Sequence, residues 1–321
     1  MNDRDSLLAQ CLSIAAVERD TGLSKDTLRV WERRYGFPCP ERDGAGDRLY
    51  PPGQVARLQT IRRLMDAGHR PGRIVALAPE ALQALVDAAP AAPVAPGAAQ
   101  ALEHYLVLIA QHDVHQLRHA LGQDALRLGL VAFVTQLVAP LNTAVGEAWM
   151  QGRFQVFEEH LYTECLTGVL RHAIAGIAPP QGRGAPRVLL TTVPQEAHGL
   201  GLLMVEALLA LEGCHCLPLG PQTPLADIVR AAQVHQADIV ALSFTAVQSP
   251  HTVLAALRTL RRQLPPHTAI WAGGQCPVLY QRPLAGVLAL ASIAALPAEV
   301  ARWRSAAAPL AGADAATMKK W

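Results

Sequence analysis

A glutamate, a histidine and two glycines lie close together in the segment Gln195-Glu-Ala-His198-Gly-Leu-Gly201. The segment follows a strand-like apolar run, Arg187–Val193, that is broken by Pro194, and it precedes a helix-like stretch from about Leu202. In an open α/β sheet, ligands bind outside the carboxyl ends of the strands, so His198 is predicted to face a binding crevice. The glycines permit a close approach of the backbone to a bulky ligand.

The spacing Glu196-x-His198-x-x-Gly201 resembles the Asp-x-His-x-x-Gly signature of cobalamin-binding domains. This resemblance implies that His198 ligates cobalt as the lower axial ligand and that Glu196 accepts the other ring N–H of the histidine. Glutamate in place of aspartate provides a longer side chain with the same carboxylate chemistry. A surface histidine near a helix start is the alternative interpretation of the motif alone.

Two further segments agree with this resemblance, in the expected order, between about residues 185 and 305. The family carries Ser-x-Leu or Ser-x-Thr on its fourth strand and Gly-Gly after its fifth, and both line the slot for the nucleotide tail of the cofactor. Here one apolar run ends in Ser243-Phe-Thr245 and another ends in Gly273-Gly274. Without the family, these residues would indicate hydroxyl groups at a loop start and a tight turn.

A second group of residues lies upstream, in a stretch of helical periodicity from about Leu126 to Ile177. Trp149 is followed after nine residues by Glu159-His160, which resembles the helical cap of the cobalamin-dependent photoreceptor regulators, the CarH/LitR group of the MerR superfamily. The resemblance implies that Trp149 packs against the 5′-deoxyadenosyl group of the cofactor and that Glu159 and His160 lie above the corrin. A core tryptophan and a surface Glu-His pair are the alternative.

One position departs from this family pattern. Members often carry a histidine directly after the tryptophan, which ligates cobalt from above once light has removed the adenosyl group, whereas this chain has Met150. A thioether is a weaker ligand than imidazole for cobalt(III). After illumination the expected upper ligand is therefore water or His160, and a sensor that does not use photolysis is an alternative.

The amino-terminal third has the pattern of a helix-turn-helix. Two helix-like segments, Ser13–Asp20 and Lys25–Tyr35, flank a turn that ends with Ser24, a good N-cap. Leu28 and Trp31 recur on one face of the second segment and are predicted to serve the core.

A wing-like loop over residues 36–50 follows. The run Arg29-Val-Trp-Glu-Arg-Arg-Tyr-Gly-Phe-Pro38 and the later Arg48-Leu-Tyr50 resemble a MerR-type winged helix-turn-helix over about residues 10–78, which implies double-stranded promoter DNA as the partner. Base edges are expected to be read near the start of the second helix, by Lys25, Thr27 and Arg29. Phosphates suit Arg33, Arg34, Arg42 and Arg48, and the predicted DNA-binding set is completed by Tyr35 and Tyr50.

Composition agrees with several modules in one chain. The 321 residues suggest two or three domains, and a hydrophobic content of 51% can supply their cores. The net charge is only +2, so the arginine cluster within residues 25–73 is interpreted as a local DNA face. The sequence shows no signal peptide and no charge-free apolar run of about 20 residues, which favours a cytoplasmic protein with reduced thiols and no membrane partner.

Other histidines and cysteines are interpreted structurally. Cys214-His215-Cys216 is the only close set among the six cysteines, and alternation along a second strand of the domain favours a core strand over metal ligation. Four histidines occur among leucines at helical spacing and are interpreted as polar faces of a helical bundle, namely His104, His112, His115 and His119.

These features predict a multidomain protein with an α-rich winged helix-turn-helix at 1–80, a four-helix-bundle cap at 101–182, and a doubly wound, Rossmann-like α/β cobalamin-binding domain at 183–308. An Ala/Pro-rich linker is expected at 81–100 and a tail at 309–321. The predicted function is a light-responsive transcriptional regulator, not an enzyme, that binds adenosylcobalamin and assembles as a dimer or tetramer. Alternatives are a regulator that senses haem, a bilin or redox state, and a corrinoid enzyme or methyl carrier, although the chain has no room for a substrate barrel of about 250 residues.

Overall fold

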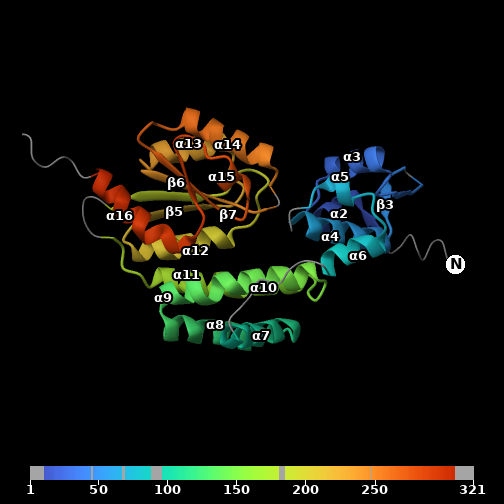
Figure 1. Cartoon of the computed structure of the whole chain (residues 1–321), viewed down its shortest axis with the longest axis horizontal. Helices are drawn as coiled ribbons and strands as arrows, with labels where there is room; N and C mark the ends of the chain where they lie inside the picture. Colours follow the sequence, from blue (N-terminus) through green and yellow to red (C-terminus); the bar gives the residue numbers. More distant parts are fainter. Residues whose placement is uncertain are drawn as a thin grey trace, which may run out of the picture. The chain divides into compact units, whose positions relative to one another are not determined.

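The computed structural model of the chain describes residues 11–44, 46–66, 69–87, 96–180, 185–246 and 248–307. The chain forms two compact units, one built from residues up to 117 together with residues 140–162, and the other from residues 118–139 together with the chain from 163 onward. Figure 1 colours the elements from blue to red along the sequence. In the central region the chain changes from one unit to the other after residues 117, 139 and 162.

The first unit begins with a winged helix-turn-helix. Helices α2 (Ile14–Thr21) and α3 (Lys25–Tyr35) accompany a small sheet in the order β1-β3-β2, formed by β1 (Leu12–Ser13), β3 (Arg48–Tyr50) and β2 (Glu41–Arg42). Both strand pairings are antiparallel, and the β2–β3 hairpin is the wing. The helices that follow the wing are α4 (Pro52–Asp66), α5 (Pro71–Ile74) and α6 (Pro79–Asp87).

Local sequence sets the turn between α2 and α3. Gly22 ends α2 in the left-handed conformation, at φ 67°, which glycine adopts without steric cost. Ser24 then begins α3, because its hydroxyl accepts a hydrogen bond from the backbone N–H of Thr27. The predicted N-cap is confirmed, and Gly36 ends α3 before the wing.

Leu28 and Trp31 anchor α3 in the core, as predicted. Leu28 is fully buried and Trp31 is 5% exposed, and both belong to one apolar cluster with Leu58 of α4 and Leu82 of α6. Tyr50, at the end of β3, belongs to the same cluster and has no exposed surface. Its predicted contact with DNA is therefore wrong, because a side chain enclosed in the core cannot reach a phosphate.

The predicted linker at 81–100 overlaps two helices. Residues 81–87 belong to α6, where Leu82 and Val86 are buried in the helix-turn-helix core. Residues 88–95 lie outside the described residues, and α7 (Pro96–Ala110) begins within the predicted range. Alanine is the strongest helix former, so an Ala/Pro-rich composition does not separate a linker from the helices beside it.

The central region is mainly helical, as predicted. After α7 it contains α8 (Val114–Leu128), α9 (Leu130–Ala132), the π-helical segment η1 (Phe133–Val138), α10 (Ala139–Met150) and α11 (Val156–Ala175). The π-helical segment ends two residues before Pro140, which lies in the first turn of α10. Proline provides no N–H for the helical ladder and its ring collides with the preceding turn, so a wider turn at this place relieves the conflict.

One helix in the described part of the chain, Leu130–Trp149, is long and apolar enough to cross a membrane by length and composition, with a mean hydropathy of 1.2. Its residues also have the two faces of a helix in a protein core. Phe133, Val134 and Leu141 are fully buried, whereas Gln136 is exposed.

The second unit contains a five-stranded parallel sheet. Its strands are β4 (Arg187–Thr191), β5 (His215–Gly220), β6 (Ile239–Phe244), β7 (Ala269–Gly274) and β8 (Val287–Leu290), in the spatial order β5-β4-β6-β7-β8. All four pairings are parallel, which confirms the predicted doubly wound α/β fold. The strands that end in Ser243-Phe-Thr245 and Gly273-Gly274 are the third and fourth along the chain, so the strand numbers expected from the resemblance are one too high.

Helices cover both faces of this sheet (Figure 1). Helices α12 (Leu200–Leu211) and α16 (Leu296–Ala307) pack together on one face, and α13 (Leu225–Val234) and α14 (Pro250–Gln263) pack together on the other. The remaining short elements are α15 (Val278–Gln281) and η2 (Ile293–Ala295).

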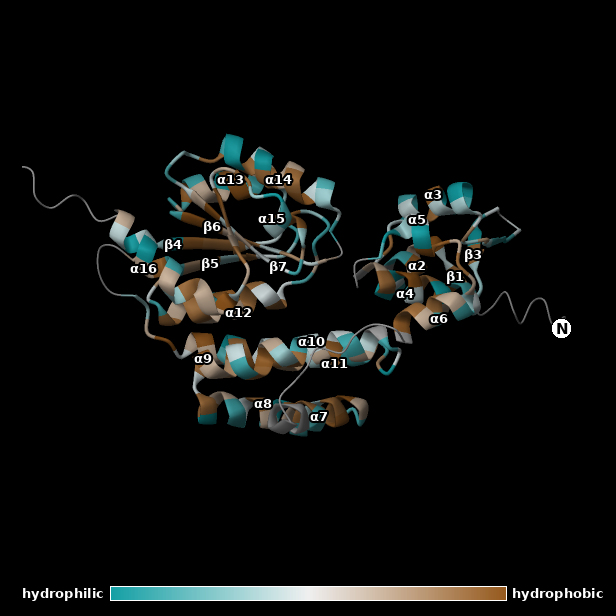
Figure 2. Cartoon of the chain, viewed as in Figure 1, coloured by the Kyte–Doolittle hydropathy of each residue, from teal (hydrophilic) through white to brown (hydrophobic). Residues whose placement is uncertain are grey.

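Helix α12 is apolar around most of its circumference, and Figure 2 shows it mainly in the hydrophobic colours. It contacts β4, β5 and β6 of the sheet, and it also contacts α9 and η1 within the same unit. A helix enclosed between a sheet and a further helical layer requires apolar residues on all sides. This packing holds the start of α12, two residues after His198, against the edge of the sheet.

The strand order reverses next to β4. From β4 the chain moves to β5 on one side and then crosses to β6 on the other side. The loops after β4 and β6 therefore diverge at the carboxyl ends of their strands, and sheets of this kind bind ligands at that point. His198 follows β4 and Thr245 follows β6, so the fold brings two predicted site residues to this place.

Candidate cofactor site and nucleic-acid interface

Glu196 joins the loop after β4 to the loop after β6. Its side chain is 1% exposed. One carboxylate oxygen, Oε1, lies 2.7 Å from Nδ1 of His198 and accepts from the backbone N–H of the same residue at 3.2 Å. The other oxygen, Oε2, accepts from the backbone N–H of Thr245 at 2.9 Å and from its hydroxyl at 2.6 Å. One buried carboxylate thus holds two predicted site residues from different loops.

This contact sets the tautomer of His198. Burial raises the pKa of the Glu196 carboxyl, but hydrogen bonds from His198 and Thr245 outweigh that effect and hold the pKa below its usual range. An ionised carboxylate only accepts hydrogen bonds, so Nδ1 donates, and in the neutral ring Nε2 carries a lone pair that can ligate a metal. The imidazole is 54% exposed. The predicted hydrogen bond between the two residues is therefore present, on a histidine that reaches the surface.

Two threonines at the end of β4 support this loop, and the sequence prediction missed them. The hydroxyl of Thr192 donates to the backbone oxygen of Glu196 at 2.5 Å and accepts from the backbone N–H of Gln222 at 2.7 Å. The hydroxyl of Thr191 donates to the backbone oxygen of Gly220 at 2.7 Å. Both threonines are fully buried, so the position of Glu196 depends on the loop after β5 as well. The available signal was the Thr-Thr pair at the end of an apolar strand.

Gly201, Ser243, Gly273 and Gly274 lie at the same carboxyl edge of the sheet. A β-carbon on Gly201 would lie 3.0 Å from Oγ of Ser243, so the first turn of α12 packs closely against the end of β6. A β-carbon on Gly274 would collide with the backbone oxygen of Phe244, at a φ of 112° that favours glycine. These glycines have a packing role, and their contact with the tail of the cofactor stays a prediction.

The predicted cap residues belong to the first unit. The guanidinium of Arg63, on α4, lies over the indole ring of Trp149 at 5.3 Å from the ring centroid. Glu159 and His160 are neighbours on α11, with Oε2 and Nε2 3.7 Å apart, and the His160 side chain is 70% exposed. The side chain of Met150 lies outside the described part of the structure. The roles of these residues toward the cofactor stay predictions.

Glu158 organises the start of α11, and the sequence prediction missed it. Its buried carboxylate accepts from the backbone N–H of Gln155 at 2.6 Å and lies 3.0 Å from Nε2 of His112. His112 is in the connection after α7, at φ 57°, rather than on a helical face. The carboxylate therefore fixes the turn that presents Glu159 and His160. The Glu-Glu-His sequence did not reveal which glutamate is buried.

The described residues contain no group of three or more His, Cys, Asp or Glu side chains that could hold a metal ion. Burial raises the pKa of the Cys214 thiol to about 11 and that of Cys216 to about 12. Cys214 is buried, Cys216 is half-buried and His215 between them is exposed, so the predicted alternation is present, but β5 is an edge strand of the sheet rather than a core strand. The predicted polar faces are also present, because the histidines of α7 and α8 are exposed, namely His104, His115 and His119.

Helix α3 presents a mainly basic face to solvent. Arg29, Arg33 and Arg34 are exposed there together with Asp26 and Val30. Their spacing of three and four residues places them on one side of the helix. Arg29 lies 3.2 Å from Asp26, and such an exposed pair is weak enough to be exchanged for a phosphate or a base.

Other predicted DNA-binding residues of α3 have protein partners. Nζ of Lys25 lies 3.5 Å from Glu18, and the hydroxyl of Thr27 lies 2.8 Å from that of Ser24. Tyr35 is half-buried. Lys25 and Thr27, at the start of the helix, therefore already have partners within the protein. The sequence prediction of base contacts did not take these partners into account.

The wing arginines differ from each other. Arg42 is exposed and donates to the backbone oxygen of Gly46 at 2.9 Å. Arg48 is mostly buried and pairs with Glu32 of α3 at 2.9 Å, and this hydrogen bond raises the pKa of Arg48. Arg42 can thus reach a phosphate, whereas Arg48 positions the wing against α3.

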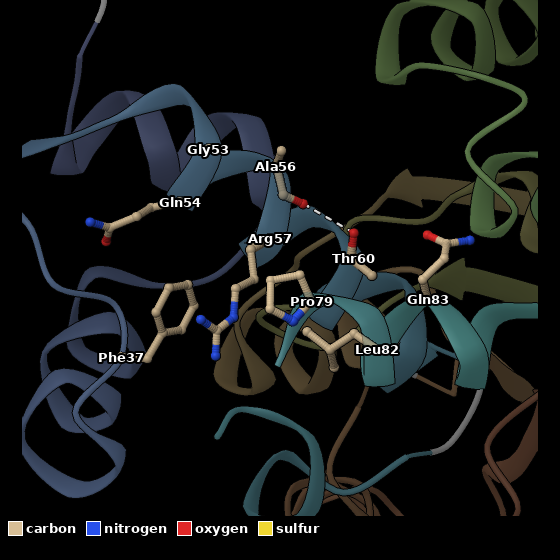
Figure 3. Close-up of a pocket in the computed structure, with 9 residues that line it drawn as sticks. All are labelled: Phe37, Gly53, Gln54, Ala56, Arg57, Thr60, Pro79, Leu82 and Gln83. Atoms are coloured by element: carbon tan, nitrogen blue, oxygen red, sulfur yellow. Dashed lines mark hydrogen bonds between the residues drawn. The ribbon is translucent and has the colours of Figure 1, made fainter. Parts of the chain in front are cut away.

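A small pocket of the first unit is lined by Arg57 and Phe37 (Figure 3). The guanidinium lies over the aromatic ring, 3.8 Å from its centroid, and donates to the backbone oxygens of Val75 and Leu77 at 3.2 and 2.8 Å. These contacts tie α4 to the connection between α5 and α6. Arg57 therefore stabilises this part of the fold.

Comparisons with protein families agree with the layout of the chain. Residues 12–80 match the family of MerR HTH regulatory proteins. Residues 98–174 and residues 186–301 match two families that are each described as a B12 binding domain. The winged helix-turn-helix, the helical region and the parallel sheet thus correspond to three known modules.

Two relatives that match most of the chain are transcriptional repressors. The chain is 32% identical to the HTH-type transcriptional repressor CarH of Myxococcus xanthus, over 79% of this chain and 85% of the relative. It is 28% identical to the HTH-type transcriptional repressor CarA of the same organism, over 82% of this chain and 86% of the relative.

Among solved structures, the monomethylamine corrinoid protein of Methanosarcina barkeri has a TM-score of 0.50 and 17% identity, over 62% of this chain and 95% of that chain. At this identity the likeness concerns the fold alone. The family is shown by the match to CarH, which covers 79% of this chain at 32% identity. The chain belongs to the CarH-like family of cobalamin-binding, MerR-type transcriptional regulators.

Proposed function

We propose that this regulator responds to light through adenosylcobalamin, with His198 as the lower ligand of cobalt. When bound, adenosylcobalamin would supply a light-sensitive cobalt–carbon bond. The observation that carries the proposal is the Glu196–His198 pair, with Oε1 and Nδ1 2.7 Å apart, at the point where the strand order reverses. An imidazole oriented by a carboxylate is a common arrangement for a metal-ligating histidine.

The donor chemistry at this edge fits a corrinoid. A neutral imidazole is a good ligand for a transition metal ion, and the lowered pKa of Glu196 keeps its carboxylate as the acceptor that this tautomer requires. Ser243 and Thr245 end one strand with hydroxyl groups, and Gly273-Gly274 end the next strand without side chains. We propose that these four residues hold the nucleotide tail and that Gly201 lets α12 begin beside it.

We propose that the adenosyl group is held by Trp149, Glu159 and His160. An indole ring can stack on adenine, and a carboxylate can accept hydrogen bonds from ribose hydroxyls. Because Arg63 covers one face of the Trp149 ring, adenine would have to use the other face or displace the guanidinium. Met150 replaces the family histidine that would otherwise ligate cobalt after illumination.

Light would change DNA binding by changing the oligomeric state of the protein in the cytoplasm. A ligand stabilises one assembly over another only if it binds that assembly more tightly. A dimer or tetramer presents several copies of α3, and paired half-sites bind such an assembly with higher affinity than a single copy. We therefore propose a homo-oligomer that holds promoter DNA in the dark and dissociates in the light.

Reconstitution of the full chain tests this proposal. The chain is loaded with adenosylcobalamin in the dark, and its absorption spectrum, size-exclusion volume and affinity for a selected DNA duplex are recorded on one sample before and after green light. We expect a larger species that binds DNA tightly in the dark and a smaller species that binds weakly after illumination. The chain without cofactor, illuminated in the same way, is the control. Photolysis without any change in size or DNA affinity would contradict light regulation.

Met150→His is expected to stabilise the illuminated state. Imidazole is a stronger ligand than a thioether for cobalt(III), so the variant should retain cobalamin longer after light than the parent chain does. Retention is measured by repeated gel filtration of illuminated samples, and the upper ligand is identified by cobalt spectroscopy. If His160 is the substitute ligand, the illuminated spectrum of His160→Ala should differ from that of the parent chain. If water is the ligand, the two spectra should be the same. A protein imidazole other than His160 above cobalt in the parent chain would contradict this prediction.

A cobalamin sensor without photolysis is the second candidate. The observation that favours it is Met150, since the family histidine is absent from that position. A reconstituted chain whose spectrum and size ignore light, but whose DNA affinity depends on cobalamin, would support this candidate. A haem or bilin spectrum in the purified protein would instead identify another tetrapyrrole.

A further inference from the structure

Helix α3 carries one exposed apolar side chain, Val30. Its exposed fraction is 41%, whereas Leu28 and Trp31 of the same helix are 0% and 5% exposed. Val30 therefore contributes little to the core that those two residues build. A single exposed apolar residue is common on protein surfaces, so its meaning depends on its neighbours.

The neighbours of Val30 form the basic face of the helix. Asp26, Arg29, Arg33 and Arg34 are exposed, and together with Val30 they occupy one side of α3. Arginines on this side attract the phosphates of DNA. The methyl groups of Val30 are thus surrounded by the residues that bring the helix to the duplex.

The start of α3 is less suited to reading bases. Lys25 pairs with Glu18, and the hydroxyl of Thr27 pairs with that of Ser24. A contact from either residue to a base would have to replace these partners. The methyl groups of Val30 need no hydrogen-bonding partner, so a contact from Val30 breaks no bond within the protein.

We infer that Val30 contacts the 5-methyl group of a thymine in the major groove and thereby contributes to the choice of operator. Thymine presents a methyl group in that groove, and apolar side chains recognise it by direct contact. Arg33 and Arg34 fix the position of the helix through phosphates, which carry no sequence information directly. The inference rests on DNA binding through α3, and it does not depend on light or on the form of the cofactor.

Replacement of thymine by uracil tests this contact, because it removes only the methyl group. An operator duplex is selected from a random pool with the full chain, and each thymine is then replaced in turn by deoxyuridine. We expect one position in each half-site where the replacement weakens binding by the parent chain about four-fold, the effect of burying one methyl group.

Val30→Ala should abolish the difference between thymine and uracil at that position. The variant should bind the thymine operator about four-fold more weakly than the parent chain. Its affinity should not fall further when the thymine is replaced by uracil, because both changes remove the same contact. Val234→Ala is the matched control, because Val234 is 69% exposed on α13, far along the chain from α3. That control should keep the full effect of uracil.

Arg34→Ala separates affinity from sequence choice. It should weaken binding to every duplex and lower the slope of log affinity against log salt by about one unit, because one phosphate contact is lost. It should leave the thymine preference unchanged, since Arg34 is not the residue that contacts the methyl group.

A Val30→Ala chain that keeps the effect of uracil at every position would overturn the inference, and so would a parent chain that tolerates every uracil replacement. Selection without a preferred sequence would also overturn it, because α3 would then read no bases. A preferred operator whose binding ignores light and cobalamin would contradict only the function proposed above.

Discussion

His198→Ala is expected to weaken cobalamin retention by about ten-fold or more and to abolish the spectrum of imidazole-ligated cobalt. The imidazole is the only side chain of the motif that combines a metal-ligating nitrogen with surface exposure, since Glu196 is 1% and His198 is 54% exposed. Alanine removes the ligand and leaves the buried carboxylate with its two bonds from Thr245. The fold of the sheet should therefore survive this change.

Binding of adenosylcobalamin in the dark and the absorption spectrum of the loaded chain measure this effect. His235→Ala is the matched control, because His235 is also exposed but follows α13 at the amino-terminal edge of the sheet. The control should bind cobalamin with the affinity and the spectrum of the parent chain. A His198→Ala chain with unchanged affinity and spectrum would show that cobalt has another lower ligand.

Glu196→Gln should have a similar effect on the cofactor without removing any ligand atom. Thr245 directs its backbone N–H and its hydroxyl at Oε2 of Glu196 at 2.9 and 2.6 Å, whereas the backbone N–H of His198 reaches Oε1 at 3.2 Å. Because the bonds at Oε2 are shorter, we expect the carbonyl oxygen of glutamine to take that place. The amide NH2 then faces Nδ1 of His198 and donates to it. Nδ1 becomes an acceptor, the ring proton moves to Nε2, and Nε2 loses the lone pair that a metal requires.

We expect Glu196→Gln to weaken cobalamin binding by about ten-fold or more, the usual range for the partner of a metal-ligating histidine. Cofactor titration measures the affinity, and circular dichroism shows that the sheet domain remains folded. Glu212→Gln, at the opposite end of α12 from His198, is the matched control and should bind normally. Normal binding by Glu196→Gln would mean that the carboxylate does not set the tautomer of the ligand.

The same contact links stability to pH. The pKa of Glu196 is lower in the folded chain than in an unfolded one, so its ionised form stabilises the fold above the unfolded pKa of about 4.3. That contribution is lost as the pH falls through the folded pKa. Glutamine does not titrate, so the difference in free energy of unfolding between the parent chain and Glu196→Gln should shrink on acidification below about pH 4. Urea unfolding at several pH values measures this difference.

Short-range signals in the sequence were sufficient for helix α3 and for the central motif. Ser24 and Gly36 delimit α3 because capping depends only on residues a few positions away. Glu196 and His198 are two positions apart in one loop, so their hydrogen bond needs no distant segment. The family resemblance extended these local signals to a MerR-type helix-turn-helix and to cobalamin binding, and the comparisons match both kinds of module.

Tertiary structure alone decided which of the recognised side chains are buried or paired. Thr245 reaches Glu196 only because β4 and β6 are neighbours in the sheet. Tyr50 follows an arginine in a basic wing, yet it is enclosed by helices from elsewhere in the chain. The sequence does not distinguish Val30 from the apolar residues beside it. Its exposure follows from the packing of Leu28 and Trp31, on another face of the helix, into the core. Residue type and spacing describe what a side chain can do, whereas its exposure and its partners depend on which distant segments pack against it.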